Sequence, residues 1–284
     1  MRLSRRLFLC TCKLICAAYF TAAAVNIASG ATICTVPEDL RRALPAAPPK
    51  LVYKTLWDKG APIEEFPLGI GHVHLAPGVD GTSDWWQRLD LPLSETPGAP
   101  PFVWIADGWL VRRDGKVEPF DSSAMVETGY EVPTFIVVAR QEDGWLKIRY
   151  LAPGNGQPFA WLPPCALTGK IKLTYTPWGK WFLLEWIAPL RFRLDTPHVL
   201  RAAPGVESDR VGIVSGDYHL VPDEVRGEWM HVKVSQPSDY CSERSKESKA
   251  ELREGWIRWF SEEKGPWLWY SPRGCQADTE REKK

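Results

Sequence analysis

The sequence has no surplus of charge of either sign. Its 284 residues include 35 Lys and Arg against 35 Asp and Glu. Four of the basic residues fall within the first thirty positions, which hold no acid, so the remainder of the chain is slightly acidic. Because binding to a phosphate backbone needs a concentrated basic face, we expect no nucleic-acid partner.

Several catalytic signatures are also missing. The sequence has no G-x-S-x-G elbow of a serine hydrolase, and no glycine-rich phosphate loop follows a strand pattern and opens a helix. Acidic pairs such as Glu64-Glu65 and Glu262-Glu263 are adjacent, so their side chains point apart on a strand and are solvated on a loop. These absences predict a protein that is not an enzyme and that needs no cofactor.

One pair of histidines deserves comparison with a metal site. His72 and His74 stand two residues apart in a strand pattern, Ile70–Leu75, and would face the same way, as a divalent ion requires. A third ligand would have to come from elsewhere, and Asp80 and Asp84 are near only in sequence. Two exposed histidines on a strand are the commoner arrangement, so we predict no metal.

Residues 1–30 have the pattern of an export signal. A positive stretch with Arg2, Arg5 and Arg6 precedes the largely apolar run Leu7–Val25, and small residues follow at Ala28–Ala31. Ser4–Leu9 resembles the twin-arginine signal. We expect cleavage and release into the periplasm of a Gram-negative cell; the alternative is an uncleaved segment that anchors the chain to the membrane.

The cysteines fit an exported protein. Three of the seven (Cys10, Cys12, Cys16) lie in the predicted signal, and four remain, none of them in a Cys-x-x-Cys pair. An even number of cysteines in an exported chain favours two disulfides over a zinc site. Of the three pairings that four cysteines allow, we favour Cys34–Cys165 together with Cys241–Cys275.

Val137–Pro164 predicts two successive β-hairpins. The β-branched run Val137–Arg140 is followed by Asp143-Gly144, a pair that favours a tight reversal. Trp145–Tyr150 then alternates, with Leu146, Ile148 and Tyr150 on one face. After a second turn, Phe159–Leu162 forms a short return strand that Pro163 ends.

A second copy of this pattern follows. Trp229–Val234 comes after the polar turn Val225–Glu228, and the return strand is Gly255–Trp259. The lead-in is repeated as well, because Arg88–Pro92 is similar to Arg193–Pro197. The sequence therefore indicates one module used twice.

The module resembles the bacterial SH3-like domain family. Arg201–Gly205 matches the family's early small-Pro-Gly turn, and Gly255-Trp256-Ile257 matches its Gly-Trp return strand. The first module departs from the pattern, with Phe159-Ala160-Trp161 in place of Gly-Trp. The resemblance implies an all-β chain of two small SH3-like β-barrels in tandem, with an N-terminal extension and loop insertions.

The expected organisation divides the chain into six parts. A short helix is predicted near Pro37–Ala43, and the strand Ile70–Leu75 is either an extra strand or the true start of the first module. The parts are a signal peptide (1–30), an N-terminal extension (31–84), SH3-like module one (85–168), a connecting hairpin (169–189), SH3-like module two (190–275) and a tail (276–284).

Aromatic side chains are the strongest functional signal. Fifteen Trp exceed what two small cores need, and flat rings on a barrel surface suit extended peptides or sugar faces. The alternative, that these rings bury an interface between the modules and hold the N-terminal segment, stays open. The candidate binding residues are Trp85, Trp86, Trp104, Trp109, Tyr130 and Trp161 in module one and Tyr218, Trp256, Trp259 and Trp269 in module two.

The resemblance implies a non-enzymatic envelope protein that binds peptidoglycan stem or bridge peptides, or a protein partner, in an aromatic-lined groove. Three other functions remain open. An inhibitor, immunity or adaptor protein would bind one specific envelope protein, and a structural subunit would self-associate through its exposed rings. A metal-dependent hydrolase, which would need the two histidines, is the least favoured.

Overall fold

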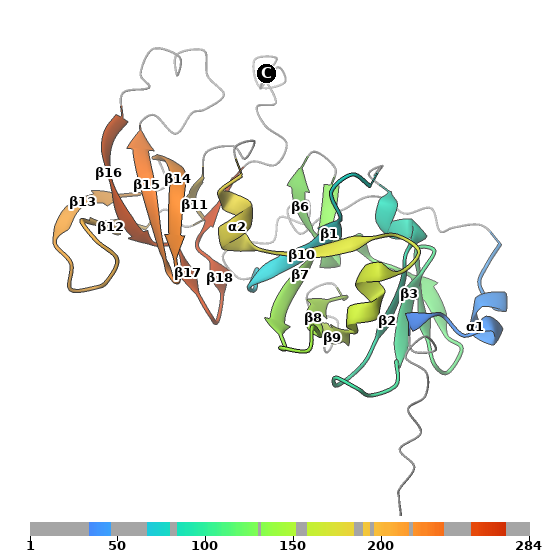
Figure 1. Ribbon diagram of the computed structural model, residues 1–284. Coiled ribbons are helices and arrows are strands. Elements are labelled where there is room, and N and C mark those ends of the chain that lie inside the picture. Colours follow the sequence, from blue (N-terminus) through green and yellow to red (C-terminus); the bar gives the residue numbers. More distant parts are fainter. Residues whose placement is uncertain are drawn as a thin grey trace, which may run out of the picture.

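The computed structural model describes residues 34–46, 67–79, 84–129, 132–151, 158–184, 190–193, 196–215, 218–235 and 251–270. The predicted signal and tail, Tyr130 and the proposed Cys241–Cys275 bond lie outside these residues. The described chain forms antiparallel sheets with two short α-helices (Figure 1), which confirms the all-β prediction.

A six-stranded sheet and a four-stranded sheet make up the first module. The larger has the order β10-β1-β7-β8-β9, with β6 paired to β7, and the smaller runs β2-β3-β4-β5. The meander β7-β8-β9 confirms the two predicted hairpins. The strands of the larger sheet are β1 (Gly71–Leu75), β6 (Val126–Gly129), β7 (Val132–Arg140), β8 (Leu146–Arg149), β9 (Phe159–Leu162) and β10 (Leu173–Pro177). Those of the smaller are β2 (Asp90–Leu93), β3 (Val103–Ala106), β4 (Trp109–Arg112) and β5 (Val117–Pro119).

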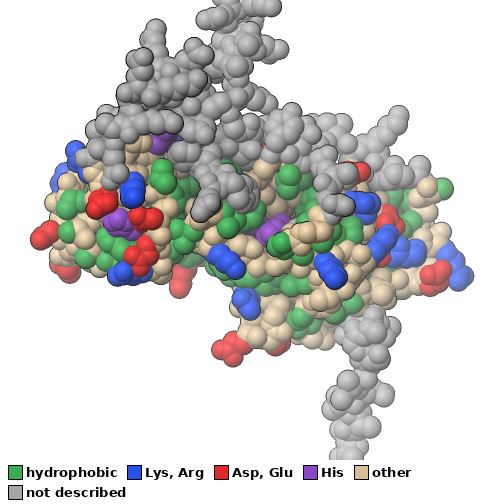
Figure 2. All heavy atoms as spheres, turned by 45° about the horizontal axis from the view of Figure 1, so that its top comes forward, with side chains coloured by type: hydrophobic (Ala, Val, Ile, Leu, Met, Phe, Trp, Pro, Cys, Tyr) green, Lys and Arg blue, Asp and Glu red, His purple; other side chains and the backbone are tan. Residues whose placement is uncertain are grey.

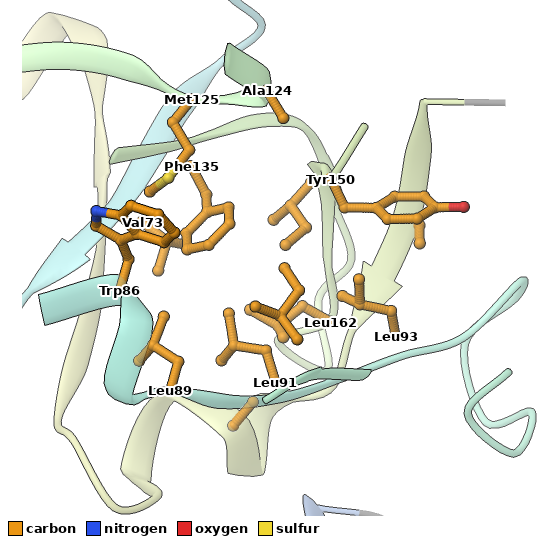
Figure 3. Close-up of a cluster of buried hydrophobic side chains, with 14 of the residues drawn as sticks. Val73, Trp86, Leu89, Leu91, Leu93, Ala124, Met125, Phe135, Tyr150 and Leu162 are labelled. Atoms are coloured by element: carbon orange, nitrogen blue, oxygen red, sulfur yellow. The ribbon is translucent and has the colours of Figure 1, made fainter. Parts of the chain in front are cut away.

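The core of this module lies between the two sheets (Figure 3). Val73 of β1 and Phe135 of β7 point into the same cluster as Leu91 and Leu93 of β2. Alternation along each strand supplies these residues from one face only. Leu146, Ile148 and Tyr150 join the cluster, as their predicted common face requires.

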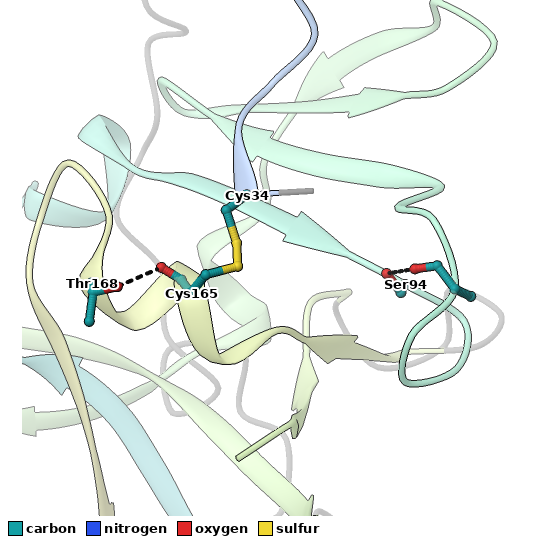
Figure 4. The surroundings of a disulfide bond; sticks show 5 residues. Cys34, Ser94, Cys165 and Thr168 are labelled. Carbon is teal, nitrogen blue, oxygen red and sulfur yellow. Dashed lines mark hydrogen bonds between the residues drawn. A yellow bond between two sulfur atoms is a disulfide. The ribbon is translucent and has the colours of Figure 1, made fainter. Parts of the chain in front are cut away.

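The N-terminal segment is fastened to the first module. Helix α1 (Glu38–Arg42) confirms the predicted short helix, with acids in its first turn and bases in its last, the arrangement that suits the helix dipole. Cys34 is bonded to Cys165, with their Cα atoms 6.0 Å apart (Figure 4), which confirms that predicted pairing. Arg41 of α1 also pairs with Asp90 and Asp107.

The second module is a five-stranded sheet of order β13-β12-β16-β15-β14. The pairing of β15 with β16 places Trp229 opposite Arg258 and Val232 opposite Gly255, which confirms the predicted second hairpin. None of the described strands closes a sheet into a barrel, so the SH3-like fold stays a prediction. The five strands are β12 (His198–Arg201), β13 (Arg210–Val214), β14 (His219–Arg226), β15 (Trp229–Ser235) and β16 (Glu251–Arg258). Two small pairs join them: β11 (Arg191–Phe192) with β19 (Leu268–Trp269), and β17 (Phe260–Ser261) with β18 (Gly265–Pro266).

The predicted connecting hairpin is wrong. Its first half is β10, which pairs with β1 inside the first sheet, and the chain then forms helix α2 (Trp178–Phe182). Trp178, Trp181 and Phe182 are spaced i, i+3 and i+4, so a helix turns all three rings to one face. The strand over 71–75 lies between β10 and β7 and is therefore integral to the first module's sheet.

Helix α2 lies between the two modules (Figure 1) and packs into a single hydrophobic cluster that both modules build. Leu68, Val126 and Ile136 contribute from the first module, and Leu220 and Met230 are among the contributions from the second. We call this cluster the shared core. Because its members come from the six-stranded sheet of the first module and the five-stranded sheet of the second, the two modules pack against each other.

Hydrogen bonds within the shared core tie α2 and Tyr270 to the neighbouring segments. The indole Nε1 of Trp178 donates to the carbonyl oxygen of Leu68 (2.8 Å). The hydroxyl of Tyr270 accepts from Trp181 Nε1 and donates to the carbonyl oxygen of Thr128, both at 2.8 Å. These bonds fix the rings of α2 to backbone and side chains of both modules.

Two glycines let the backbones of the modules meet. A Cβ built on Gly265 would lie 2.3 Å from the oxygen of Gly69 and 2.7 Å from its nitrogen. The amide of Leu68 donates to the carbonyl oxygen of Lys264 beside this contact (3.0 Å). No larger residue fits at Gly265 without separating the two backbone segments.

We predict that Gly265→Ala destabilises the protein by about 1–3 kcal/mol more than Gly98→Ala, because overpacking is costly where backbone cannot move. Gly98 is a matched control, since both glycines have φ of +79° and a Cβ on Gly98 would meet nothing within 4 Å. Urea unfolding of both variants measures the difference. Equal losses would show that the backbone contact is not tight.

His72 is buried at the same junction. Its ring is fully buried between the rings of Trp178 and Trp181, with centroids 4.3 and 4.5 Å away, and beside His74 at 4.7 Å. Among the described residues, neither ring nitrogen of His72 has a hydrogen-bond partner. Burial, with a smaller contribution from His74, lowers the pKa of His72 well below its usual 6.5.

The lowered pKa of His72 makes the junction sensitive to acid. The unfolded chain binds a proton near pH 6.5 and the folded chain does not, so stability is full above that pH and is lost below it, by up to about 1.4 kcal/mol per pH unit. We predict that His72→Phe flattens the loss of unfolding free energy between pH 7 and pH 5. At pH 8 the variant should be at least as stable as the wild type, because no hydrogen bond is removed. An unchanged acid slope would contradict the assignment to His72.

Candidate ligand-binding site

Six of the ten aromatic residues predicted to lie on a barrel surface are buried. Their exposed fractions do not exceed 6%, so the predicted surface placement is wrong for them. Trp85 and Trp86 belong to the core between the first module's sheets, and Trp259 and Trp269 to the shared core. The remaining two of the six are Trp104 and Trp256.

Trp104 and Trp256 are covered by side chains from neighbouring segments. Trp104 packs with Val36 and Val111 beneath the N-terminal segment, as the alternative interpretation of the aromatics expected. Trp256 lies under the guanidinium of Arg226, 4.8 Å from the ring centroid, and beside His231 at 5.3 Å. Alternation correctly places a strand's side chains on two opposite faces, but it does not show that other side chains cover both faces of the strands that hold Trp104 and Trp256.

Three predicted rings are partly exposed and stand apart. Trp109 lies on β4 near α1, and Trp161 lies on β9 with Lys147 5.9 Å from its ring centroid. Tyr218 packs against the shared core from the second module. Within the described chain no ring contact joins any two of them, so they do not form one aromatic groove.

A pocket of about 370 Å³ opens in the second module. It lies where residues 196–198, the end of β16 and the β17–β18 hairpin meet. We call it the Trp267 pocket, after the one aromatic indole that lines it. Its other lining residues are the cations Arg193, Arg258 and Lys264, the hydroxyl residues Thr196 and Ser261, and His198 and Glu263.

The chain fixes Trp267 and the two arginines in place. The amide of Trp267 donates to the carbonyl oxygen of Trp259 (2.7 Å), and its own carbonyl oxygen accepts from the amide of Arg193 (2.9 Å). Arg193 Nη1 donates to the carbonyl oxygen of Pro266 (2.9 Å). The guanidinium of Arg258 lies 5.5 Å from the centroid of Trp267, within range of a cation–π attraction.

Arg258 has a second anchor in Glu228. Its Nε and Nη2 donate to the same carboxylate oxygen, at 2.8 and 2.6 Å. Both side chains are about two-fifths exposed, so the pair adds little to stability. Its effect is to orient the guanidinium along the pocket wall.

His198 supplies hydrogen-bonding groups rather than charge. Its ring stacks on Phe192, with centroids 3.6 Å apart and planes 1° from parallel, and Nε2 lies 3.2 Å from the hydroxyl of Thr196. Burial lowers the pKa of His198 to about 4. The ring is therefore neutral at neutral pH, and the positive charge of the pocket comes from Arg and Lys alone.

Charges elsewhere on the molecule are mixed. Figure 2 shows acidic and basic side chains interspersed over one face, with hydrophobic side chains between them. Within the described residues, no group of three or more His, Cys, Asp or Glu is placed to hold a metal ion. Asp80, which is near the histidine pair in sequence, lies outside those residues.

No family model, curated protein or solved structure matches the chain. Across the described segments, no helix combines the length and apolar character needed to cross a membrane.

Sequence analysis did not select the residues of the Trp267 pocket. Trp269 was predicted to bind the ligand and Trp267 was not. In the structure Leu268 and Trp269 of β19 are both buried. A usable signal was present at Lys264-Gly265-Pro266-Trp267, where a basic and an aromatic residue stand close together in a turn. A cation next to a ring is typical of a binding surface, whereas adjacent apolar residues are typical of a core.

Two tryptophans of the second module should differ sharply on truncation. Trp259→Ala empties part of the shared core and should cost about 3–5 kcal/mol of unfolding free energy. Trp267→Ala removes a partly exposed ring and should cost less than half as much. Urea unfolding of both variants tests the difference, and a larger loss for Trp267→Ala would contradict the assignment of core and pocket.

Proposed function

We propose that the protein is an exported, non-enzymatic binding protein of the cell envelope. In this proposal the two modules are SH3-like, and the second holds peptidoglycan peptides in the Trp267 pocket. The observation that carries the proposal is the pocket itself, with a flat indole beside two anchored arginines. Rings of this kind bind peptide backbone and small side chains with little loss of entropy.

The local structure of the second module supports an SH3-like fold. β12 and β13 form a hairpin around Ala203-Pro204-Gly205, the turn on which the resemblance rests. A Cβ on Gly255 would lie 2.7 Å from the carbonyl oxygen of Arg201. The Gly of the Gly-Trp motif therefore has a physical cause, since β12 and β16 approach too closely there for a side chain.

The size of the pocket supports a short ligand segment. At about 370 Å³ it falls at the small end of ligand pockets, enough for one or two peptide residues. Hydroxyl groups of Thr196 and Ser261 and the neutral ring of His198 offer further hydrogen bonds. Nothing in this set needs to react with the ligand, so binding is the activity proposed.

Co-sedimentation with purified peptidoglycan sacculi tests this function. The chain from Ala31 onward should pellet with sacculi. Trp267→Ala should lower the bound fraction at least several-fold while the variant stays folded, with less than half of the stability loss expected for Trp259→Ala. Trp161→Ala is the matched control, because it removes a partly exposed ring far from the pocket. Wild-type protein that stays in the supernatant would contradict the proposal.

A protein partner is the second candidate. Val199, Val211 and Ile213 are exposed on neighbouring strands β12 and β13, with 36–45% of each residue accessible. Val199 and Ile213 face each other in the register, and β13 is the last strand of its sheet. An exposed apolar face beside an edge that no described strand pairs with suits docking of another protein.

A pull-down from envelope extract separates the two candidates. Capture of one stoichiometric partner that is lost with Ile213→Lys and kept with Trp267→Ala would favour the adaptor or inhibitor function. Loss of sacculus binding with Trp267→Ala alone favours peptide recognition.

A further inference from the structure

The Trp267 pocket has an excess of positive charge. Arg193, Arg258 and Lys264 line it, against the single carboxylate of Glu263. Counting Glu228, which pairs with Arg258 from outside the lining, still leaves one positive charge in excess. His198 does not alter this balance at neutral pH, because burial lowers its pKa to about 4.

Donor groups on the wall remain available to a ligand. Arg258 uses Nε and Nη2 for Glu228, and within the described residues its Nη1 makes no hydrogen bond to protein. The ammonium of Lys264 likewise has no protein partner there, although the backbone of Lys264 is tied to Ser261 and Leu68. A ligand anion would therefore find donors that no described residue occupies.

The donors are also held in advance. Arg258 is fixed by Glu228 and by the face of Trp267, and Arg193 by the carbonyl oxygen of Pro266. Arg258 Nη1 and the ammonium of Lys264 can each donate to a carboxylate, and such charge-assisted hydrogen bonds are stronger than neutral ones. Orientation before binding reduces the entropy lost on binding.

We infer that the Trp267 pocket recognises a carboxylate group of its peptide ligand. This inference rests on the proposed function and names the chemical group that the pocket selects. Two sources of the group exist in a stem peptide, the C-terminal α-carboxylate and the carboxylate of an acidic residue within the chain. The contact to Arg258 and Lys264 is the same for either source.

Calorimetric titration with four synthetic peptides distinguishes the sources. The parent is Ala-γ-D-Glu-Lys-D-Ala, and the others carry a C-terminal amide, an amide in place of the glutamate α-carboxylate, or both. Removing the recognised carboxylate should weaken binding roughly 10- to 100-fold, the usual effect of losing hydrogen bonds to a charged group. The amide that produces this loss identifies the source.

Variants of the protein locate the contact. Arg258→Gln and Lys264→Gln should bind the parent peptide several-fold more weakly and should no longer distinguish it from the recognised amide. Arg210→Gln is the matched control, because it removes the same charge from an exposed position on β13 outside the pocket. Affinity for the parent peptide should also fall as salt is raised, since Arg258 and Lys264 are exposed to solvent.

The outcomes separate this inference from the function on which it rests. Equal affinity of the wild type for all four peptides would overturn carboxylate recognition and leave peptide binding intact. A loss of discrimination in Arg210→Gln equal to that in Arg258→Gln would also overturn it, by showing a general charge effect. Failure of the wild type to bind any of the four would overturn both proposals.

Discussion

The packing of α2 between the two modules is the contact on which the rest of the structure depends. Trp178 is fully buried. Its ring stacks on Phe182 and meets Trp269 edge to face, and its Nε1 donates a hydrogen bond to the carbonyl oxygen of Leu68. A helix of five residues has negligible stability alone, so tertiary contact must hold it. In return it completes the hydrophobic core of the second module by covering one face of the five-stranded sheet.

The Trp267 pocket is a consequence of the same packing. Its hairpin wall, β17–β18, touches the first module through Gly265 and the Lys264 carbonyl, while Trp259 and Trp269 on either side of Trp267 point into the shared core. Burying these two rings leaves Trp267 turned to the surface beside Arg258. The binding surface and the junction are therefore built from neighbouring residues of one segment, and a change that loosens the junction should distort the pocket.

Local patterns in the sequence predicted local structure well. Alternation, turn residues and acids at a helix start predicted the β7–β8–β9 meander, the β15–β16 pairing and helix α1. The Cys34–Cys165 bond was part of the pairing favoured among three that four cysteines allow. Patterns could not tell which side of a strand meets another layer. Trp256 and Trp269 were expected on the surface because two small barrels need few rings, but a core shared between modules and a covering guanidinium bury them. The helix at 178–182 was missed because its apolar residues fit either the helix period or the strand period over so short a run.

The pocket depends on residues far apart in the chain, Arg193 and Lys264 among them, and no local sequence pattern joins these.

Native-state hydrogen exchange on the intact chain tests most directly whether the two modules form one cooperative unit. The shared core predicts that the slowest amides of β7 in the first module and of β15 in the second open with the same free energy and respond equally to denaturant. Opening of β15 at a distinctly lower free energy, with β7 still protected, would contradict the shared core and restore two independent modules.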